Sequence, residues 1–308
     1  MKRLQTVFLA AALGGMWCSA VWAQQVPAVP TYNAQQLETL VARIALYPDP
    51  LLAQTLTAAT FYSEIPDADG WARAHAYLSG DQLAGAIRED KLPWDPSVQA
   101  LLPFPGVLDL MAGDMAWTQQ LGDVVLADRA SVMDAIQDQR QKAYSYGYLR
   151  TGPQYRVLTP AAGEIDILPV DPNLLYVPYY DPFVVFYRPR PGFFIGGAIT
   201  FGPRIFIGSF LPWGWGGISF GWRAHSIVIG GRPWERTWVN RGVYVHPYEG
   251  LRPNLSRPIA RPGVPTPVPA PAPRMERHEL RQYTPAPRNA APAAPQRGGS
   301  TGGREQHR

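Results

Sequence analysis

A serine motif is the first feature of the sequence that could do chemistry. Residues 217–221 read Gly-Ile-Ser-Phe-Gly and match the G-x-S-x-G pattern, in which a nucleophilic serine stands between a strand and a helix. Glu235 and His246 follow Ser219 in the order that acid and base partners take in such hydrolases. The required helix is not predicted, because residues 226–229 are rich in β-branched side chains, and the many nearby glycines make a chance match easy. We therefore interpret the motif as structural glycine and assign no catalytic residue.

Acidic residues near the middle of the first half offer two further kinds of chemistry. Residues 67–70, Asp-Ala-Asp-Gly, resemble part of a calcium loop, but aligning the glycine puts apolar residues at the first and last ligand positions. Glu64, Asp67 and Asp69 would have to face one another across a cleft to act as the carboxylate pair of a glycoside hydrolase. A solvated helix start capped by Asp67 explains these acids more simply.

No metal or cofactor is expected from the sequence. The histidines do not form an i, i+4 pair with a third ligand nearby, as a zinc site would require; they are His75, His225, His246, His278 and His307. No Walker loop or complete dinucleotide-binding fingerprint is present in the sequence.

The amino-terminal segment predicts export. Residues 1–23 combine Lys2 and Arg3, an apolar run over 7–15 and a small residue, Ala23, at the expected cleavage position. We interpret this segment as a signal peptide; the alternative is a membrane anchor, for which the apolar run is short. The only cysteine of the sequence lies in this segment, so the exported chain would lack disulfides and thiol chemistry. The expected location is the periplasm or cell envelope.

Charge is divided along the chain. Residues 24–181 contain 19 acidic and 9 basic side chains, whereas residues 182–308 contain 5 acidic and 17 basic ones. This polarity allows the two parts to attract each other, or the basic part to hold an external polyanion. The expected partners are anionic envelope polymers, lipid headgroups or a protein, and peripheral membrane association stays open. Export argues against nucleic acid.

Helical periodicity extends over a first domain, expected at residues 24–150. Asn33 and Gln36 form a potential capping box, and residues 51–61 are apolar on nearly every face, which predicts a central buried helix. Asp-Pro at 49–50 and at 95–96 is typical of a helix start, with the carboxylate as the cap. Six or seven helices are expected, at about 33–46, 49–61, 67–78, 80–90, 95–102, 114–128 and 130–146, with a turn over 103–106.

The period changes from 3.6 to 2 near residue 151, which begins a β-strand and Gly/Trp-rich region expected over 151–250. Strands are predicted at 155–158, 165–170 and 174–180, a hairpin turn at 171–173, and a second hairpin over 237–245. Residues 251–308 are rich in Pro, Ala and Arg and predict a disordered tail. The predicted fold class is therefore α+β, with a multi-helix domain followed by a small antiparallel β unit.

Five tryptophans stand among glycines in the second half and form a candidate binding surface: Trp213, Trp215, Trp222, Trp234 and Trp238. Our first interpretation of this stretch is a soluble β unit, with the rings in its core. The alternative is a stacking surface, because Trp and Tyr faces with nearby Arg suit sugar rings, lipid headgroups or a partner chain.

Four sequence blocks follow one another at residues 44–54, 94–98, 117–122 and 176–182. Their motif residues are Tyr47, Pro48, Asp49, Pro50, Trp94, Asp95, Pro96, Trp117, Tyr176, Pro178, Asp181 and Pro182. Together the blocks resemble the domain of unknown function 3300 family of bacterial exported proteins. The resemblance covers roughly 33–182 and implies export to the envelope and a helical domain joined to a small strand unit. It supplies no reaction or ligand, so no catalytic residue is carried over.

The leading hypothesis is an exported, non-enzymatic envelope protein that acts as a binding or scaffold module. The alternative, from another class, is an envelope polysaccharide or peptidoglycan hydrolase that uses carboxylates of the helical domain. Glu64 and Asp69 are the carboxylates on which that alternative depends.

Overall fold

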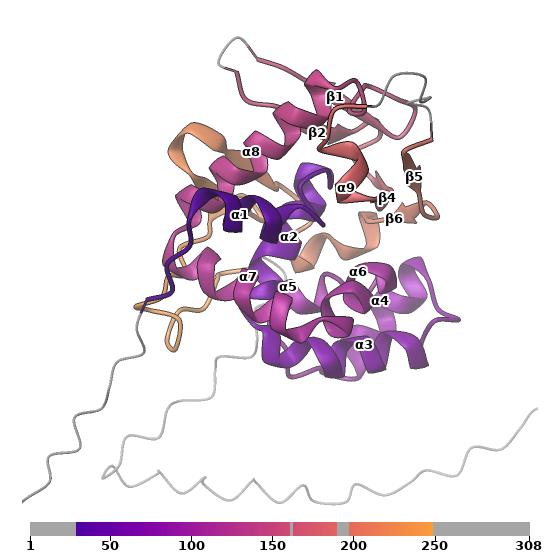
Figure 1. Ribbon diagram of the computed structural model, residues 1–308. Helices are drawn as coiled ribbons and strands as arrows, with labels where there is room; N and C mark the ends of the chain where they lie inside the picture. Colours follow the sequence, from indigo (N-terminus) through magenta and orange to yellow (C-terminus); the bar gives the residue numbers. More distant parts are fainter. Residues whose placement is uncertain (1–28, 161–162, 190–196, 249–308) are drawn as a thin grey trace, which may run out of the picture. The chain divides into compact units, whose positions relative to one another are not determined.

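A computed structural model describes residues 29–160, 163–189 and 197–248 of the chain (Figure 1). Helices come first in this part of the sequence and short antiparallel strands follow, so the predicted α+β class is confirmed. The predicted signal peptide, 1–23, and the predicted disordered tail, 251–308, lie outside the described residues.

The helical part contains one element that the sequence did not predict. Residues 103–106 were expected to turn, but a helix begins at Pro105, where the missing N–H of proline costs no hydrogen bond. The helices of this part are α1 (Ala34–Val41), α2 (Asp49–Ala59), α3 (Ile65–Ala74), α4 (Gly80–Glu89), α5 (Pro96–Gln99), α6 (Pro105–Gly113), α7 (Met115–Ala127) and α8 (Arg129–Ser145), with a 3₁₀ turn η1 (Tyr62–Glu64) before α3.

Helix starts follow the predicted capping only in part. The capping box at α1 is confirmed, since Asn33 and Gln36 each accept a hydrogen bond from the backbone N–H of the other. The predicted cap at Asp67 is wrong. Helix α3 begins two residues earlier, at Ile65, so that Asp67 lies inside its first turn and makes no side-chain cap.

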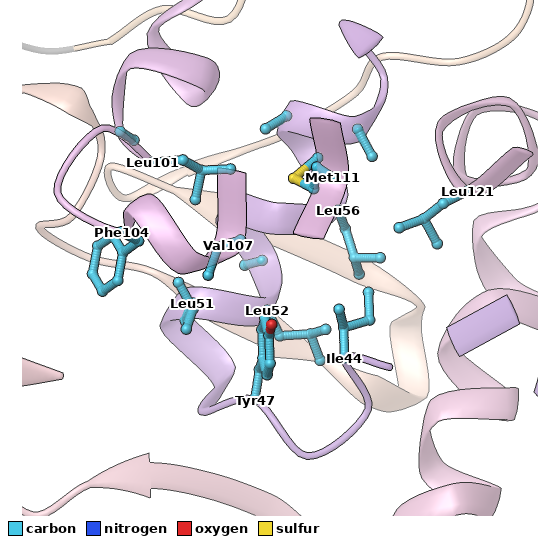
Figure 2. Packing of buried hydrophobic residues seen from close by; sticks show 14 of the residues in the cluster. Ile44, Tyr47, Leu51, Leu52, Leu56, Leu101, Phe104, Val107, Met111 and Leu121 are labelled. Carbon is cyan, nitrogen blue, oxygen red and sulfur yellow. The ribbon is translucent and has the colours of Figure 1, made fainter. Parts of the chain in front are cut away.

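Helix α2 is the centre of the core, as its apolar pattern predicted. Every residue of α2 except Pro50 is buried. Figure 2 shows Leu52 and Leu56 of α2 among side chains of other elements, including Val107 and Met111 of α6. A helix that is apolar on all faces must be covered on all faces, and this one organises the others around itself.

The strands are short and pair differently from the prediction. They are β1 (Tyr155–Leu158), β2 (Asp166–Pro169), β3 (Leu174–Leu175), β4 (Pro178–Tyr180), β5 (Ile199–Phe201), β6 (Ile205–Phe206), β7 (Ser219–Gly221), β8 (Ser226–Ile229) and β9 (Arg232–Pro233). The antiparallel pairs are β1 with β2, β3 with β6, β4 with β5, β7 with β8, and β8 with β9.

Neither predicted hairpin forms. The turn at 171–173 exists, with Asp171 accepting the N–H of Asn173, but the strands that flank it pair with other partners. Over 237–245 the Asn240 side chain bonds the backbone of Thr237 and Glu235, which gives a local turn in place of a ladder. The valines of this segment are also exposed, so no apolar face supports a strand pair.

The strand region shares its core with the helices. Its sheets have two or three strands and cannot bury a core of their own. One hydrophobic cluster instead runs from Leu37 in α1 to Tyr248 near the end of the described chain. The change of period near residue 151 is therefore a change of secondary structure within one packed body. Among the described residues, no helix combines the length and the apolar character that crossing a membrane requires.

A glycine sets the distance between α2 and α7. A Cβ atom at Gly122 would lie 2.0 Å from the backbone oxygen of Ala59, so only glycine permits this approach. We predict that Gly122→Ala lowers the free energy of unfolding by about 1–3 kcal/mol through overpacking. Urea denaturation measures the change.

The matched control is Gly85→Ala in α4, where an added Cβ meets nothing within 4 Å. This substitution should stabilise the protein by about 0.5–1 kcal/mol, because alanine is the better helix former. Equal effects of the two substitutions would contradict the close helix crossing.

Candidate functional site

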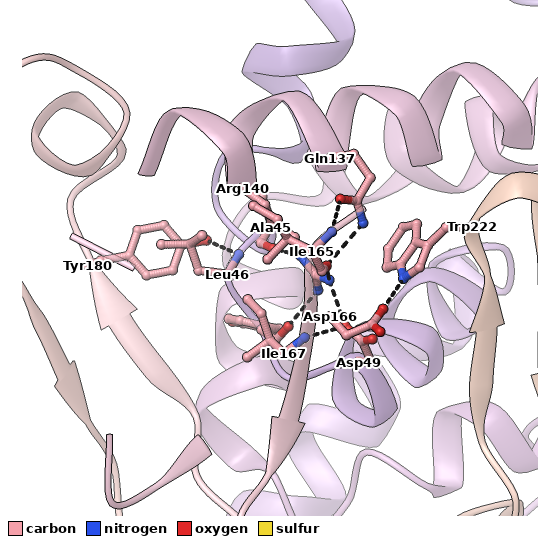
Figure 3. A network of polar contacts seen from close by, with 11 residues as sticks. Ala45, Leu46, Asp49, Gln137, Arg140, Ile165, Asp166, Ile167, Tyr180 and Trp222 are labelled. Carbon is pink, nitrogen blue, oxygen red and sulfur yellow. Dashed lines mark hydrogen bonds and ion pairs between the residues drawn. The ribbon is translucent and has the colours of Figure 1, made fainter. Parts of the chain in front are cut away.

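Arg140, on α8, is fully buried, so its positive charge has no contact with water. Its guanidinium donates to three backbone carbonyls, through Nε to Ala45 at 2.9 Å, Nη2 to Tyr47 at 3.0 Å and Nη1 to Ile165 at 2.7 Å (Figure 3). Nη1 also lies 2.7 Å from Oδ1 of Asp49. We call these five residues the Arg140 network. It joins α8 to α2, to the connection between α1 and α2, and to the chain that enters β2.

Asp49 supplies the opposite charge of the network. Its Oδ1 also accepts the backbone N–H of Ile167, at 3.4 Å. Burial raises the pKa of the Asp49 carboxyl to about 6, although the Arg140 guanidinium acts to lower it, so the carboxyl is ionised at neutral pH. The predicted capping role of Asp49 is wrong, since α2 begins at Asp49 itself. Its side chain instead faces inward, toward a full positive charge.

Trp222 closes the network on the side of the Gly/Trp-rich region. The Arg140 guanidinium carbon lies 4.9 Å from the centre of the Trp222 ring, within cation–π range. The indole N–H of Trp222 donates to Asp166 at 2.9 Å. Gln137 exchanges two hydrogen bonds with the backbone of Ile165 beside it. Helix, strand and tryptophan segment are therefore held at one buried point.

Tyr180 makes a second connection between the strands and the helices. Its hydroxyl donates to the carbonyl of Ala42 at 2.9 Å and accepts the N–H of Leu46 at 3.2 Å. Burial raises the pKa of this hydroxyl, which therefore stays protonated and able to donate. Pro178, two residues earlier, is buried at the start of β4, and Tyr176 is half-buried.

Other motif residues predicted from the sequence also make hydrogen bonds that cap helices or hold the core together. Asp95 caps α5 by accepting the N–H of Ser97, with Pro96 in the first turn, and the carbonyl of Trp94 accepts from Gln99. The buried Trp117 donates to the carbonyl of Leu40. Asp181 caps a short helix, α9 (Pro182–Val185), by accepting the N–H of Phe183 at 2.8 Å.

The tryptophans that formed the candidate binding surface are not exposed. Trp213, Trp215, Trp222 and Trp234 are all at most 8% exposed, and Trp238 is half-buried. The indole N–H groups of Trp213 and Trp215 donate to Gln99 and to the carbonyl of Ala100. Their ring faces fill the core while their N–H groups reach acceptors on the helices. The rings of Trp213 and Trp215 therefore connect the two halves of the chain, and four of the five tryptophans are buried away from solvent.

The residues considered for catalysis are also engaged elsewhere. Glu64 accepts the N–H of Asp95 at 2.7 Å, and Asp69 pairs with Arg73 at 2.9 Å. Ser219 is exposed in β7, and a three-residue 3₁₀ turn, η3 (Trp222–Ala224), stands where a nucleophile motif needs a helix. In the part of the chain that the structure describes, no three His, Cys, Asp or Glu side chains are close enough to hold a metal ion.

A groove of about 1150 Å³ lies beside α1, and we call it the α1 groove. Its walls are α1, the first turns of α7, the second half of α8, and the segment 182–188, which contains α9. The lining is mostly aromatic and amide: Tyr32, Trp117, Tyr146, Phe183, Phe186 and Tyr187, with Asn33, Gln35, Gln36, Gln120 and Gln139. A concave surface of aromatic rings with convergent polar groups is typical of ligand sites.

Most charges in the α1 groove are paired. Arg43 bonds Asp114 at 2.9 Å, and Lys142 bonds Glu38 on α1. The N–H of Trp117 and the Arg43 guanidinium lower the pKa of the Asp114 carboxyl, which keeps it ionised. Arg188 has no ion-pair partner among the described residues, so the groove carries one uncompensated positive charge at its rim.

The α1 groove was not predicted from the sequence, although one signal for it was present. Asp181-Pro182 repeats the Asp-Pro helix start that was recognised at two earlier positions. Applied at 182, the same rule predicts a short helix that presents the aromatic residues after it. The contribution of α1 and α8 to the same groove depends on tertiary packing, which no local pattern contains.

Fold and groove together define a class of protein: a helical domain, packed with short antiparallel strands, that carries a concave aromatic and amide surface. The chain belongs to the family described as "Protein of unknown function (DUF3300)", whose model matches residues 33–237, and this confirms the resemblance found in the sequence. The "Uncharacterized protein YacH" of Escherichia coli (strain K12) is 32% identical over 186 residues. The match covers 50% of this chain and only 30% of YacH. No solved structure is significantly similar to the chain.

We predict that Arg140→Lys lowers the free energy of unfolding by about 3–5 kcal/mol, as breaking a buried ion pair does. Lysine has three donors on one atom and cannot span three carbonyls and a carboxylate that surround a planar guanidinium. Chemical denaturation measures the loss. Arg73→Lys, at an exposed arginine on α3 that pairs with Asp69 and Asp109, is the control and should leave the midpoint near that of the unmodified protein.

Proposed function

We propose that this protein is an exported cell-envelope protein that binds an envelope polymer without chemically changing it, and that the α1 groove is the binding site. Export is supported by the composition of residues 1–23 and the absence of cysteine from the rest of the sequence. Binding is supported by the groove, whose size and mixed lining suit an extended ligand.

The observation that carries this proposal is the exposure of aromatic rings at the groove. Phe183 is 80% exposed and Tyr187 is 59% exposed, although four of the five tryptophans of the same half of the chain are buried. Large apolar side chains gathered at a concave surface mark interaction sites in soluble proteins. Phe183 and Tyr187 therefore replace the buried tryptophans as the candidate binding residues.

Charge supports a polyanionic polymer. The chain from residue 182 onward carries 17 basic and 5 acidic side chains, and Arg188 brings one of these positive charges to the groove rim. An unpaired guanidinium at a rim attracts carboxylates and phosphates, and salt screens this attraction. The groove carboxylates Glu38 and Asp114 are both held in ion pairs, which supports binding over acid–base catalysis.

We predict that Phe183→Ala and Tyr187→Ala each reduce retention of the exported protein by isolated cell envelopes at least tenfold in a sedimentation assay. Loss of an exposed aromatic contact removes apolar area from the interface without disturbing the core. Tyr77→Ala is the matched control, since Tyr77 is 78% exposed and does not line the groove. Equal retention of all three variants contradicts the groove as binding site.

Arg188→Gln tests the electrostatic part separately. This variant should bind envelopes more weakly at low salt and show a smaller loss of binding as salt increases, because one screened interaction has been removed. The unmodified protein should lose retention progressively over the same titration. Retention that does not respond to salt would contradict a polyanionic ligand.

Export has its own test. The amino-terminal sequence of the protein recovered from cells should begin at Gln24, since cleavage is expected after Ala23. Recovery of a chain that still begins at Met1 would refute the signal peptide.

A further inference from the structure

Side chains attach the end of the described chain, residues 243–248, to the rest of the protein. The backbone N–H groups of Val243 and Tyr244 bond to the nearby carbonyl of Asn240, and that of Tyr248 bonds to His246. Among the described residues, no backbone group of 245–248 makes a hydrogen bond outside this segment. His246 and Tyr248 point inward and are 4% and 7% exposed. We call residues 243–248 the terminal segment.

His246 makes a hydrogen bond from the terminal segment to the strands. Its Nε2 lies 3.0 Å from the carbonyl oxygen of Ile229 in β8. A carbonyl oxygen can only accept a hydrogen bond, so Nε2 carries a hydrogen. The other ring nitrogen, Nδ1, lies 3.0 Å from the hydroxyl oxygen of Tyr244, and this oxygen accepts the backbone N–H of Glu235 at 2.9 Å.

These hydrogen bonds require a neutral imidazole. When the single ring hydrogen is on Nε2, Nδ1 has a free lone pair and accepts the O–H of Tyr244. A second hydrogen on Nδ1 would point at the hydroxyl hydrogen of Tyr244, with only 3.0 Å between the two heavy atoms. The hydroxyl group would have to rotate and give up its acceptor, which costs free energy inside the protein. Protonation of His246 therefore opposes the closed position of the terminal segment.

Several elements bring titratable or charged groups toward the ring of His246. They are Asp95 at the start of α5, Arg232 in β9, Glu235 after β9, and Tyr244 and Tyr248 in the terminal segment. Burial has the largest effect and lowers the pKa of His246, and Arg232 also acts to lower it. The Ile229 carbonyl and the two carboxylates act in the opposite direction. Burial raises the pKa of both tyrosine hydroxyls, which stay protonated and bring no charge.

We propose that His246 is a pH-sensitive switch, which holds the terminal segment closed at neutral pH and releases it in mild acid. In the open segment the imidazole is in water and has its ordinary pKa of about 6.5, above that of the closed state. The closed state therefore has its full stability above about pH 6.5 and loses stability as the pH falls below this value.

Opening of the terminal segment changes the surface of the protein. The Tyr248 ring packs beside Gly214 and Ile229, since a Cβ atom at Gly214 would lie 3.0 Å from Cε1 of Tyr248 and 2.5 Å from Cγ2 of Ile229. Withdrawal of this ring exposes apolar surface in acid that is covered at neutral pH. The switch is independent of the function proposed above, because no residue of 243–248 lines the α1 groove.

Hydrogen exchange of the full chain at about pH 7.5 and about pH 5.5, corrected for the intrinsic effect of pH on exchange, tests this inference. The amides of the terminal segment should open about fivefold or more often at the lower pH, where the imidazole of the open state is mostly charged. His246→Gln keeps a donor for the Ile229 carbonyl and does not titrate, so this variant should lose the response. His225→Gln is the matched control and should keep it, since His225 pairs with Asp134 outside the segment.

Equal opening of the terminal segment at the two pH values overturns the switch. A response that persists in His246→Gln also overturns it, because the response then comes from another group, such as Asp95. If His246→Gln leaves the segment open at both pH values, nitrogen NMR of the unmodified protein decides. At neutral pH the hydrogen of His246 should be on Nε2, whereas that of His75 should be on Nδ1, which lies 2.9 Å from the carbonyl of Trp71. A neutral His246 with its hydrogen on Nδ1 contradicts the inference.

Discussion

The buried guanidinium of Arg140 is the interaction on which the rest of the structure depends. A charge removed from water is tolerated only when it is paired and hydrogen-bonded, and Asp49 with three backbone carbonyls gives each nitrogen of the Arg140 guanidinium at least one acceptor. Those carbonyls belong to segments that have no regular secondary structure to satisfy them. The network therefore fixes the irregular connection after α1 and the entry to β2 at once, and it gives the Asp49 side chain of the motif a structural role.

The buried tryptophans also join the two halves of the chain, because they combine core packing with hydrogen bonds. Sheets of two or three short strands are not stable by themselves in water, so the second half must pack against the helices to bury its apolar side chains. Trp213, Trp215 and Trp222 do this with ring faces that fill the core and N–H groups that bond specific acceptors on the helical side or in β2. One wall of the α1 groove, the segment after Tyr180, is held by the hydroxyl of that residue against the backbone that follows α1. This hydrogen-bonded wall belongs to the surface that we propose as the binding site.

The sequence patterns predicted those elements whose formation depends on interactions between residues close in the sequence. The capping box at Asn33, the all-round apolar pattern of α2 and the change of period near residue 151 each specify an element by themselves, and the structure contains each of them. Strand pairing was wrong on both sides of residues 171–173, because a turn determines the direction of the chain and not the partner of the next strand. The role of Asp49 was wrong for a similar reason. Its partner, Arg140, is 91 residues away, and nothing near Asp49 in the sequence announces it.

The α1 groove was likewise predictable only in the part that depends on local sequence. Asp181-Pro182 is a local helix signal that leads to Phe183, whereas the meeting of that segment with α1, α7 and α8 is a product of the core. Composition could identify aromatic residues as candidates for binding, but burial decided which of them face solvent, and burial depends on packing. Four of the five tryptophans, which have larger faces and an N–H that needs an acceptor, are buried.

Hydrogen exchange of the protein, with and without soluble fragments of the cell envelope, tests the proposed binding site most directly. We expect slower exchange on ligand addition at the backbone amides of α1 and of residues 183–188, with no change over 213–238. Protection confined to 213–238, with the α1 groove unaffected, would contradict it.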